Sequence, residues 1–171
     1  MNRTTHSIQR RVTAQAHVDT PLGPLLLART EHGLAGAWFA AQKHHPGELD
    51  APERPDDELL QRAATQLREF FAGTRAHFDL PLDLHGTTFQ RNVWQALLQI
   101  RAGTTRSYAE LAGALGSANA VRAVGGAIGR NPVSVIVPCH RVIGRDGSLT
   151  GYAGGVDRKR ALLDLEAASG R

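Results

Sequence analysis

Short stretches of apolar residues, separated by turns, dominate the first quarter of the chain. Residues 12–18, 23–29 and 33–39 carry apolar side chains at alternate positions or in short runs. Glycine- or proline-bearing turns separate the three stretches. The pattern predicts a small antiparallel meander of three strands.

A helical spacing replaces this pattern further along the chain. Residues 57–72 carry apolar side chains at intervals of three and four, which predicts an amphipathic helix that ends at Gly73. Residues 78–85 alternate again but contain Pro81, so we expect an edge strand or an extended linker there. We place a domain boundary near residues 80–87 and divide the chain into domains 1–82 and 83–171.

The second domain opens with a pattern typical of helices. Thr87 and Gln90 have the spacing of a capping box at a helix start. The apolar residues that follow at helical spacing predict one buried face of a helix that ends before Gly103, formed by Phe89, Val93, Trp94, Leu97 and Ile100.

Two shorter helices are predicted next. Ser107 and Glu110 form a second capping box, which opens a helix that runs to Gly116. A helix over residues 118–129, begun by Ser117 or Asn119, consists almost entirely of small residues. Two short helices around one glycine resemble a helix-turn-helix, although this signal is weak on its own.

An apolar run over residues 133–137 ends at Pro138 and predicts a buried strand that delivers Cys139. A turn at Asp146–Gly147 and a glycine-rich loop over residues 151–155 follow. The last helix is predicted from Val156 to about Ala168. Its leucines predict an apolar face, so Glu166 is expected on the polar side, where a glutamate is more often solvated than buried.

Composition and charge narrow the classes of protein. The chain has 171 residues, 42% of them hydrophobic, and a net charge of +4, which is typical of a globular protein. Residues 1–86 hold nine basic and eleven acidic residues, whereas residues 87–171 hold eleven and five. The second half therefore suits a polyanion, although chance variation explains the difference equally well. No stretch approaches the ~20 apolar residues that span a bilayer, and residues 1–12 are polar, so we expect a cytoplasmic protein.

Cys139 is the only cysteine, which excludes an internal disulfide and a multi-cysteine zinc cluster. It is either an inert small hydrophobe or a free thiol that the cell keeps reduced. The eight histidines show no recognisable ligand spacing, so we expect no metal. A nucleophilic thiol would need a base or a cation that lowers its pKa, and His140 and Arg141 follow it directly. Because consecutive side chains usually point apart, His140 is expected to act through a bridging water, with Glu166 orienting its other nitrogen.

Several motifs follow one another in a fixed order between Phe89 and Glu166. They are Gly103-Thr104-Thr105 with Ser107-Tyr108, Arg122-Ala123-Val124-Gly125, Asn131-Pro132, Pro138-Cys139-His140-Arg141-Val142, Gly151-Tyr152 with Gly154-Gly155, and Lys159 with Leu162-Leu163 and Leu165-Glu166. This set closely resembles the O6-alkylguanine-DNA alkyltransferases. The first half of the chain is similar to that family only in size, in its hairpin at residues 20–25 and in its order of strands and helix.

The resemblance implies an α+β fold. The N-terminal domain would hold an antiparallel sheet and one helix of ribonuclease H-like type. The C-terminal domain would be mostly helical, of winged helix-turn-helix type. Together these would bind double-stranded DNA that contains O6-alkylguanine.

The resemblance also implies a reaction. Cys139 would accept the methyl or other alkyl group irreversibly, without a cofactor, and each protein molecule would react once. His140, a water and Glu166 would relay the proton, and Asn131 would brace the turn before the active-site segment. On the residues alone, Asn131 fits equally well as a helix-ending residue before proline.

Contacts with DNA are implied as well. Arg122 would fill the gap left by a flipped guanine, and Tyr108 would push the 3′ phosphate and touch the base. The residues alone favour a solvated charge for Arg122 and a core aromatic for Tyr108. The other implied DNA-binding residues are Ala123, Thr105, Ser107 and Gly125. The implied base pocket comprises Tyr108, Val142, Tyr152, Ala153 and Gly154, with the Ala153 amide donating to O6 and the carbonyls of Cys139 and Val142 accepting from the exocyclic amine.

Three other classes compete with this interpretation. A sensor of alkylated DNA would lack Cys139, and a regulator of the adaptive response would carry further cysteines in an N-terminal zinc module. A cysteine hydrolase would need a direct Cys–His hydrogen bond, which adjacent residues rarely form. We therefore expect a monomeric DNA-repair alkyltransferase with no membrane partner. The sequence leaves open whether O4-alkylthymine is repaired and whether copies bind DNA cooperatively.

Overall fold

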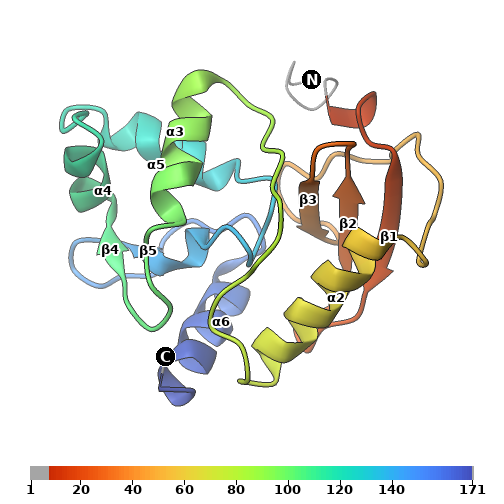
Figure 1. The fold of residues 1–171 in the computed structure, drawn as a ribbon. Coiled ribbons are helices and arrows are strands. Elements are labelled where there is room, and N and C mark those ends of the chain that lie inside the picture. The colour runs from red at the N-terminus through yellow and green to blue at the C-terminus, as the bar shows by residue number, and fades with distance from the viewer. Residues whose placement is uncertain (1–7, 171) are drawn as a thin grey trace.

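A computed structural model describes residues 8–170, and residues 1–7 of the polar N-terminal stretch lie outside the described part (Figure 1). The elements are β1 (Ala14–Val18), β2 (Leu25–Arg29), β3 (Leu34–Phe39), α2 (Glu58–Phe71), α3 (Thr88–Leu97), β4 (Arg106–Ser107), α4 (Tyr108–Ala114), α5 (Val121–Gly129), the 3₁₀ helix η1 (Cys139–Arg141), β5 (Val142–Ile143) and α6 (Val156–Ala168). Sheet and α2 occupy one side of the molecule and α3, α4 and α5 the other (Figure 1). The predicted α+β class, with an N-terminal antiparallel sheet and a helical C-terminal part, is confirmed.

The N-terminal sheet is the predicted meander. Its strands pair antiparallel in the order β1-β2-β3, with Val18 opposite Leu25 and Leu25 opposite Phe39. Both faces are covered, since alternate residues of β2 and β3 enter two different apolar clusters. The larger cluster also contains side chains of α2, α3, α5 and α6, so one core joins the two halves of the chain.

The outer edge of β3 joins the sheet to the C-terminal half. Leu34 forms a parallel bridge with Leu82, and Ala37 forms another with Val133. The segment 78–85 thus contributes a single bridge and no regular strand, as expected of an extended linker. Because both bridges lie on β3, this strand fixes the position of the segment that leads to Cys139.

Helix starts follow the predicted caps in two of three cases, and the structure adds a cap at Asp57. The Asp57 carboxylate accepts the Leu60 amide at the start of α2, and both predicted capping boxes, at Thr87 and at Ser107, are present. The helix α5 begins only at Val121 and has no side-chain cap, so the predicted start at Ser117 or Asn119 is wrong. The Ala120 amide donates to the Ser117 carbonyl, and this turn takes the place of the first predicted helical residues.

Packing of α3 differs from the prediction at one residue. Val93, Trp94 and Leu97 are buried, and the Trp94 indole donates to the Ala127 carbonyl of α5 at 2.8 Å. Phe89 was expected on the same buried face but is 38% exposed. It lies in the first turn of α3, where the helix has not yet reached the core.

The apolar run 133–137 is buried but is not a strand, which corrects the prediction. Val135 has a φ of +72°, and the Val137 amide donates to the Val133 carbonyl, so the segment coils. Asn131 causes this path, because its side chain accepts the Val133 amide at 2.9 Å and donates to the Val137 carbonyl at 2.8 Å. A continuous apolar run indicates burial but does not distinguish a strand from such a turn. Within residues 8–170, no helix is long and apolar enough to cross a membrane.

Candidate active site

Cys139 opens η1 at the end of the segment that Asn131 organises. It is only 5% exposed, and its Sγ accepts a hydrogen bond from the Asn131 amide at 3.1 Å. The Cys139 carbonyl accepts the Val142 amide and keeps a second lone pair. Asn131 therefore contacts the sulfur itself as well as the backbone of the segment that leads to it.

The Cys139 thiol is protonated at neutral pH in this structure. Burial raises its pKa from 9.0 to about 11, and the Asn131 hydrogen bond and the charge of Lys159 lower it only in part. Neighbouring groups therefore lower the pKa of this thiol, but in the free protein burial outweighs them, so the expected net lowering is wrong. A nucleophilic thiolate has to form during the reaction, so a proton acceptor must lie near the sulfur.

A buried cluster next to Cys139 centres on Glu166. His140 Nε2 lies 2.8 Å from Glu166 Oε1, and the Arg141 guanidinium donates to both carboxylate oxygens at 2.7–3.1 Å. The Gly103 amide donates to Oε2 at 3.2 Å. Burial alone would raise the pKa of Glu166. The hydrogen bonds and charges of His140 and Arg141 outweigh burial and lower this pKa to about 2. The carboxylate is therefore ionised at every physiological pH.

The ionised carboxylate sets the tautomer of His140. Burial lowers the pKa of His140, so the free ring is neutral at pH 7. An ionised carboxylate can only accept, so Nε2 carries the ring proton and donates it to Glu166. The lone pair is left on Nδ1, which is buried and has no hydrogen-bond partner in the described part of the chain. His140 thus presents a proton acceptor one residue from the thiol.

Glu166 is fully buried, so the expectation of a solvated glutamate on the polar side of the last helix is wrong. The buried residues of α6 are Lys159, Leu162 and Glu166, which share one face at intervals of three and four. Leu163 and Leu165 were expected to mark the apolar face but are only half-buried. The inward face of α6 therefore carries an ammonium and a carboxylate on either side of one leucine.

Lys159 is fully buried, and the sequence interpretation gave it no role. Its Nζ donates to the Thr150 carbonyl at 2.9 Å and lies 3.5 Å from the Tyr108 hydroxyl, which donates to the same carbonyl at 2.9 Å. The pKa of Lys159 lies below its usual value, because the effect of burial is larger than the opposite effect of the nearby Cys139. The three residues thus join the start of α4, the start of α6 and the loop before Tyr152.

The residues of the expected base pocket lie next to this cluster. Val142 and Gly154 are fully or largely buried, Ala153 is half-buried, and Tyr152 is buried with a hydroxyl that has no partner among residues 8–170. A side chain at Gly154 would meet the rings of Tyr152 and Phe39 at 2.8 and 3.2 Å. Only glycine fits there without displacing an aromatic ring.

The six expected DNA-binding residues lie on or just before α4 and α5, and three of them are exposed. Arg122, Ala123 and Thr105 are exposed, and the Arg122 side chain makes no hydrogen bond or ion pair within residues 8–170. Ser107 is occupied as the N-cap of α4, since its hydroxyl accepts the Glu110 amide at 3.0 Å. Gly125 faces the Tyr108 ring, where a side chain would make ordinary contact.

Two features of the site were not predicted from the sequence, for different reasons. The hydrogen bonds from the Arg141 guanidinium to Glu166 join residues 25 apart in the sequence, and no local spacing predicts them. The burial of Lys159 does have a signal, because it precedes Leu162 and Glu166 by three and seven residues on one helix. Within the part of the chain that the structure describes, no three His, Cys, Asp or Glu side chains form a group that could hold a metal ion.

Comparison with protein families gives matches over both halves of the chain. The ribonuclease-like domain of 6-O-methylguanine DNA methyltransferase matches residues 15–84, and the DNA binding domain of the same family matches residues 88–168. The methylated-DNA–protein-cysteine methyltransferase of Mycobacterium tuberculosis is 50% identical over 149 residues, which cover 87% of this chain and 89% of that protein. The protein of the same name from Methanosarcina barkeri is 47% identical over 87% of this chain and 94% of its own.

Solved structures agree with these matches. The crystal structure of Mycobacterium tuberculosis OGT in complex with DNA superposes with a TM-score of 0.86 at 46% identity, covering 92% of this chain and 94% of that one. O6-methylguanine-DNA methyltransferase from Pyrococcus kodakaraensis superposes with a TM-score of 0.53 at 22% identity over 90% of this chain and 98% of its own, which shows a shared fold.

Proposed function

The chain belongs to the 6-O-methylguanine DNA methyltransferase family, and from this premise we propose that it repairs DNA by moving an alkyl group from O6 of guanine to Cys139. One observation carries the proposal: the sole thiol is buried beside a neutral histidine whose free Nδ1 can accept its proton. A soft sulfur nucleophile is the side chain best suited to attack a saturated carbon.

The transfer conserves atoms and charge. The Cys139 proton passes through a bridging water to Nδ1 of His140, and the ionised Glu166 stabilises the imidazolium through Nε2. The thiolate attacks the alkyl carbon, the S–C bond forms and the C–O6 bond breaks. The electron pair of the C–O6 bond stays on the purine, which takes up one proton while the His140 imidazolium gives one up, so the products are guanine, a thioether and neutral His140. A thioether has no easy leaving path, so each protein molecule reacts once.

The proposed substrate is double-stranded DNA, bound by the surface of α4 and α5. The O6 substituent cannot reach a buried sulfur while the base is stacked, so the guanine has to be flipped out. The exposed Arg122 at the start of α5 would fill the gap, and Tyr108 would contact the flipped nucleotide. Phosphate neutralisation by the basic second half makes the binding depend steeply on salt and little on sequence.

We further propose that the protein acts as a monomer in the cytoplasm. The chemistry needs Cys139 as a free thiol, which a reducing compartment maintains. Every residue assigned to the transfer comes from this one chain. A cysteine hydrolase is less well supported, because the Cys139 sulfur is hydrogen-bonded to Asn131 and not to the His140 ring.

Stoichiometry tests the proposed function. Excess duplex containing O6-methylguanine should give a burst of at most one methyl transferred per protein molecule, because the thioether does not turn over. Peptide mass spectrometry should place the gained methyl on Cys139. Continued turnover, or a methyl gain on another residue, would contradict the proposal.

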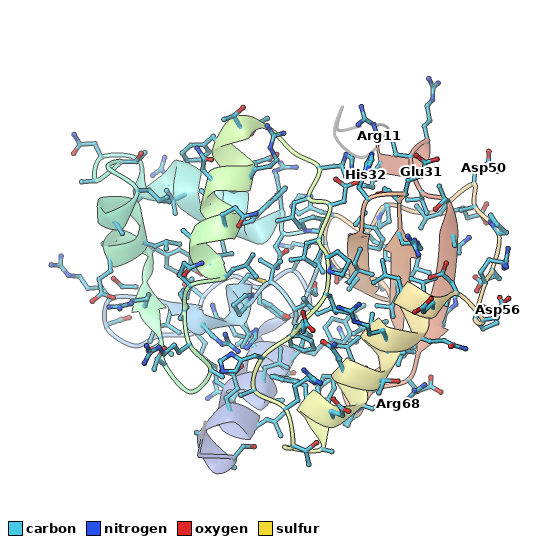
Figure 2. All side chains as sticks on the ribbon, in the orientation of Figure 1. Arg11, Glu31, His32, Asp50, Asp56 and Arg68 are labelled. Carbon is cyan, nitrogen blue, oxygen red and sulfur yellow. The ribbon has the colours of Figure 1, made fainter. Side chains whose placement is uncertain are left out.

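Replacement of Arg122 by alanine should slow repair of duplex DNA by about ten- to a hundredfold, because the flipped state loses the group that replaces the missing stack. Reaction with the free O6-methylguanine base should stay within about twofold, since no base has to be flipped. Arg68→Ala is the matched control, since Arg68 is an exposed arginine of α2, across the molecule from α5 (Figures 1 and 2). Equal losses on both substrates would refute the assignment of Arg122.

A further inference from the structure

The loop that would cover the flipped base is a tight turn over residues 152–155. The Gly155 amide donates to the Tyr152 carbonyl at 2.9 Å, which makes Ala153 and Gly154 the two central residues. Within residues 8–170 the amides of these two residues donate to no protein acceptor. The turn therefore presents two N–H groups that a purine can engage.

Both central carbonyls of the turn are held by groups outside it. The Ala153 carbonyl accepts the backbone amide of Lys43 at 3.0 Å, and the Gly154 carbonyl accepts Nη1 of Arg158 at 2.9 Å. Each hydrogen bond fixes the peptide plane that contains the carbonyl. The bond from Lys43 therefore orients the plane that carries the Gly154 amide, and the bond from Arg158 orients the next plane, which carries the Gly155 amide that closes the turn.

Arg158 also binds the N-terminal sheet. Its Nε donates at 2.8 Å to the carbonyl of Leu22, in the turn between β1 and β2, 136 residues away in the sequence. Its guanidinium lies over the Phe39 ring, 4.4 Å from the ring centroid, at the end of β3. One planar group thus makes two hydrogen bonds in different directions and one cation–π contact, a combination for which arginine is suited and lysine is not.

The surroundings leave the turn little freedom. Phe39 packs under Arg158 on one side and lies close to Gly154, where even a methyl group would approach its ring to 3.2 Å. Arg158 itself is half-buried and lies in the first turn of α6, one residue before the buried Lys159. A change at Arg158 would remove one of the two attachments of the turn to the N-terminal half and leave the Lys43 bond, without touching Cys139, His140 or Glu166.

We infer that Arg158 is a positioning residue for the alkyl transfer, because it fastens the turn at residues 152–155 to the N-terminal sheet and so holds the Ala153 and Gly154 amides in place for the base. The inference rests on the proposed function for the identity of that base. It gives the N-terminal domain a part in substrate recognition, although that domain holds none of the residues assigned to the chemistry.

The variant Arg158→Met tests this inference, since it keeps an unbranched apolar stem and removes the donors. The methyl gain of Cys139 is followed by mass spectrometry at increasing concentrations of free O6-methylguanine base. The half-saturating concentration should rise about tenfold, the cost of one charge-assisted hydrogen bond, while the maximal rate changes less than threefold or so. Hydrogen exchange of the Gly155 amide, which closes the turn, should become faster, and exchange in the middle of α6 should not change.

Arg160→Met is the matched control, because Arg160 is an exposed arginine two residues further along α6. It should match the native protein in both measurements. Arg158→Lys, which keeps the charge over Phe39, serves if the methionine variant does not fold, and it should show a smaller shift in the same direction. Half-saturation within twofold of native for every folded Arg158 variant would overturn the inference, as would unchanged exchange of the turn. Failure of the native protein to react would instead refute the proposed function, and the exchange measurement would still decide whether Arg158 holds the turn.

Discussion

Replacement of Cys139 by serine is expected to abolish alkyl transfer, with a loss of at least about a thousandfold in the rate of methyl removal from duplex DNA. A serine hydroxyl is a far weaker acid and a harder nucleophile than a thiol, and His140 cannot deprotonate it to a useful extent. The chain contains no second cysteine that could take over. The measurement is the amount of O6-methylguanine left in an oligonucleotide after incubation with excess protein.

The serine variant should still fold and bind DNA. Serine is slightly smaller than cysteine, and its Oγ can accept the hydrogen bond that the Asn131 amide now gives to the sulfur. The thermal midpoint and the affinity for unmodified duplex should therefore stay close to the native values, which separates loss of chemistry from loss of structure. Undiminished removal of methyl by this variant would end the assignment of Cys139 as the acceptor.

The fold was largely accessible from the sequence because its elements carry local signals. Alternation along β1, β2 and β3 and the caps at Asp57, Thr87 and Ser107 act within a few residues, where spacing is informative. The segment 133–137 shows the limit of such signals. Its path depends on one polar side chain, Asn131, which competes with strand pairing for the backbone groups.

The site was less accessible because its energetics depend on burial. The sequence places His140 beside Cys139, but it does not show that burial raises the pKa of the thiol and lowers that of the histidine. Nor does it show that Glu166 faces inward, since a glutamate near the end of a helix is usually solvated. The resemblance to a family indicated these residues, whereas the structure shows which of their atoms are in contact.

The two halves of the chain contribute different parts of the candidate site. The proposed acceptor sulfur, the histidine and the carboxylate come from η1 and α6, while the turn proposed to cover the base contacts Lys43 directly, and Leu22 and Phe39 through Arg158. Glu166 lies at the centre of the first group, because its two oxygens accept from a backbone amide, a histidine and an arginine. Its removal should therefore affect both the chemistry and the stability.

Replacement of Glu166 by glutamine is the second change with a large expected effect. The amide cannot accept on its nitrogen, so Arg141 and either Gly103 or His140 lose an acceptor, and the buried guanidinium loses its counter-charge. Removing one partner of a buried ion pair costs roughly 3–5 kcal/mol, which should appear in the free energy of unfolding measured with urea at pH 7. The transfer rate should also fall by about a hundredfold or more, because the imidazolium of His140 is no longer stabilised. Glu69→Gln is the matched control, since Glu69 pairs with Arg75 at the partly exposed surface, and it should cost about 1 kcal/mol or less.

The acid dependence of stability gives this prediction its sharpest test. The pKa of Glu166 falls from 4.5 to about 2 on folding, so between these values the unfolded chain binds a proton that the folded protein does not. The stabilisation from Glu166 is therefore complete above pH 4.5 and is lost as the pH falls toward 2. Glutamine does not titrate, so the difference in unfolding free energy between native protein and Glu166→Gln should be largest at neutral pH and shrink steadily below pH 4.5. A difference that stays constant down to pH 3 would show that the buried carboxylate is not ionised as the contacts require.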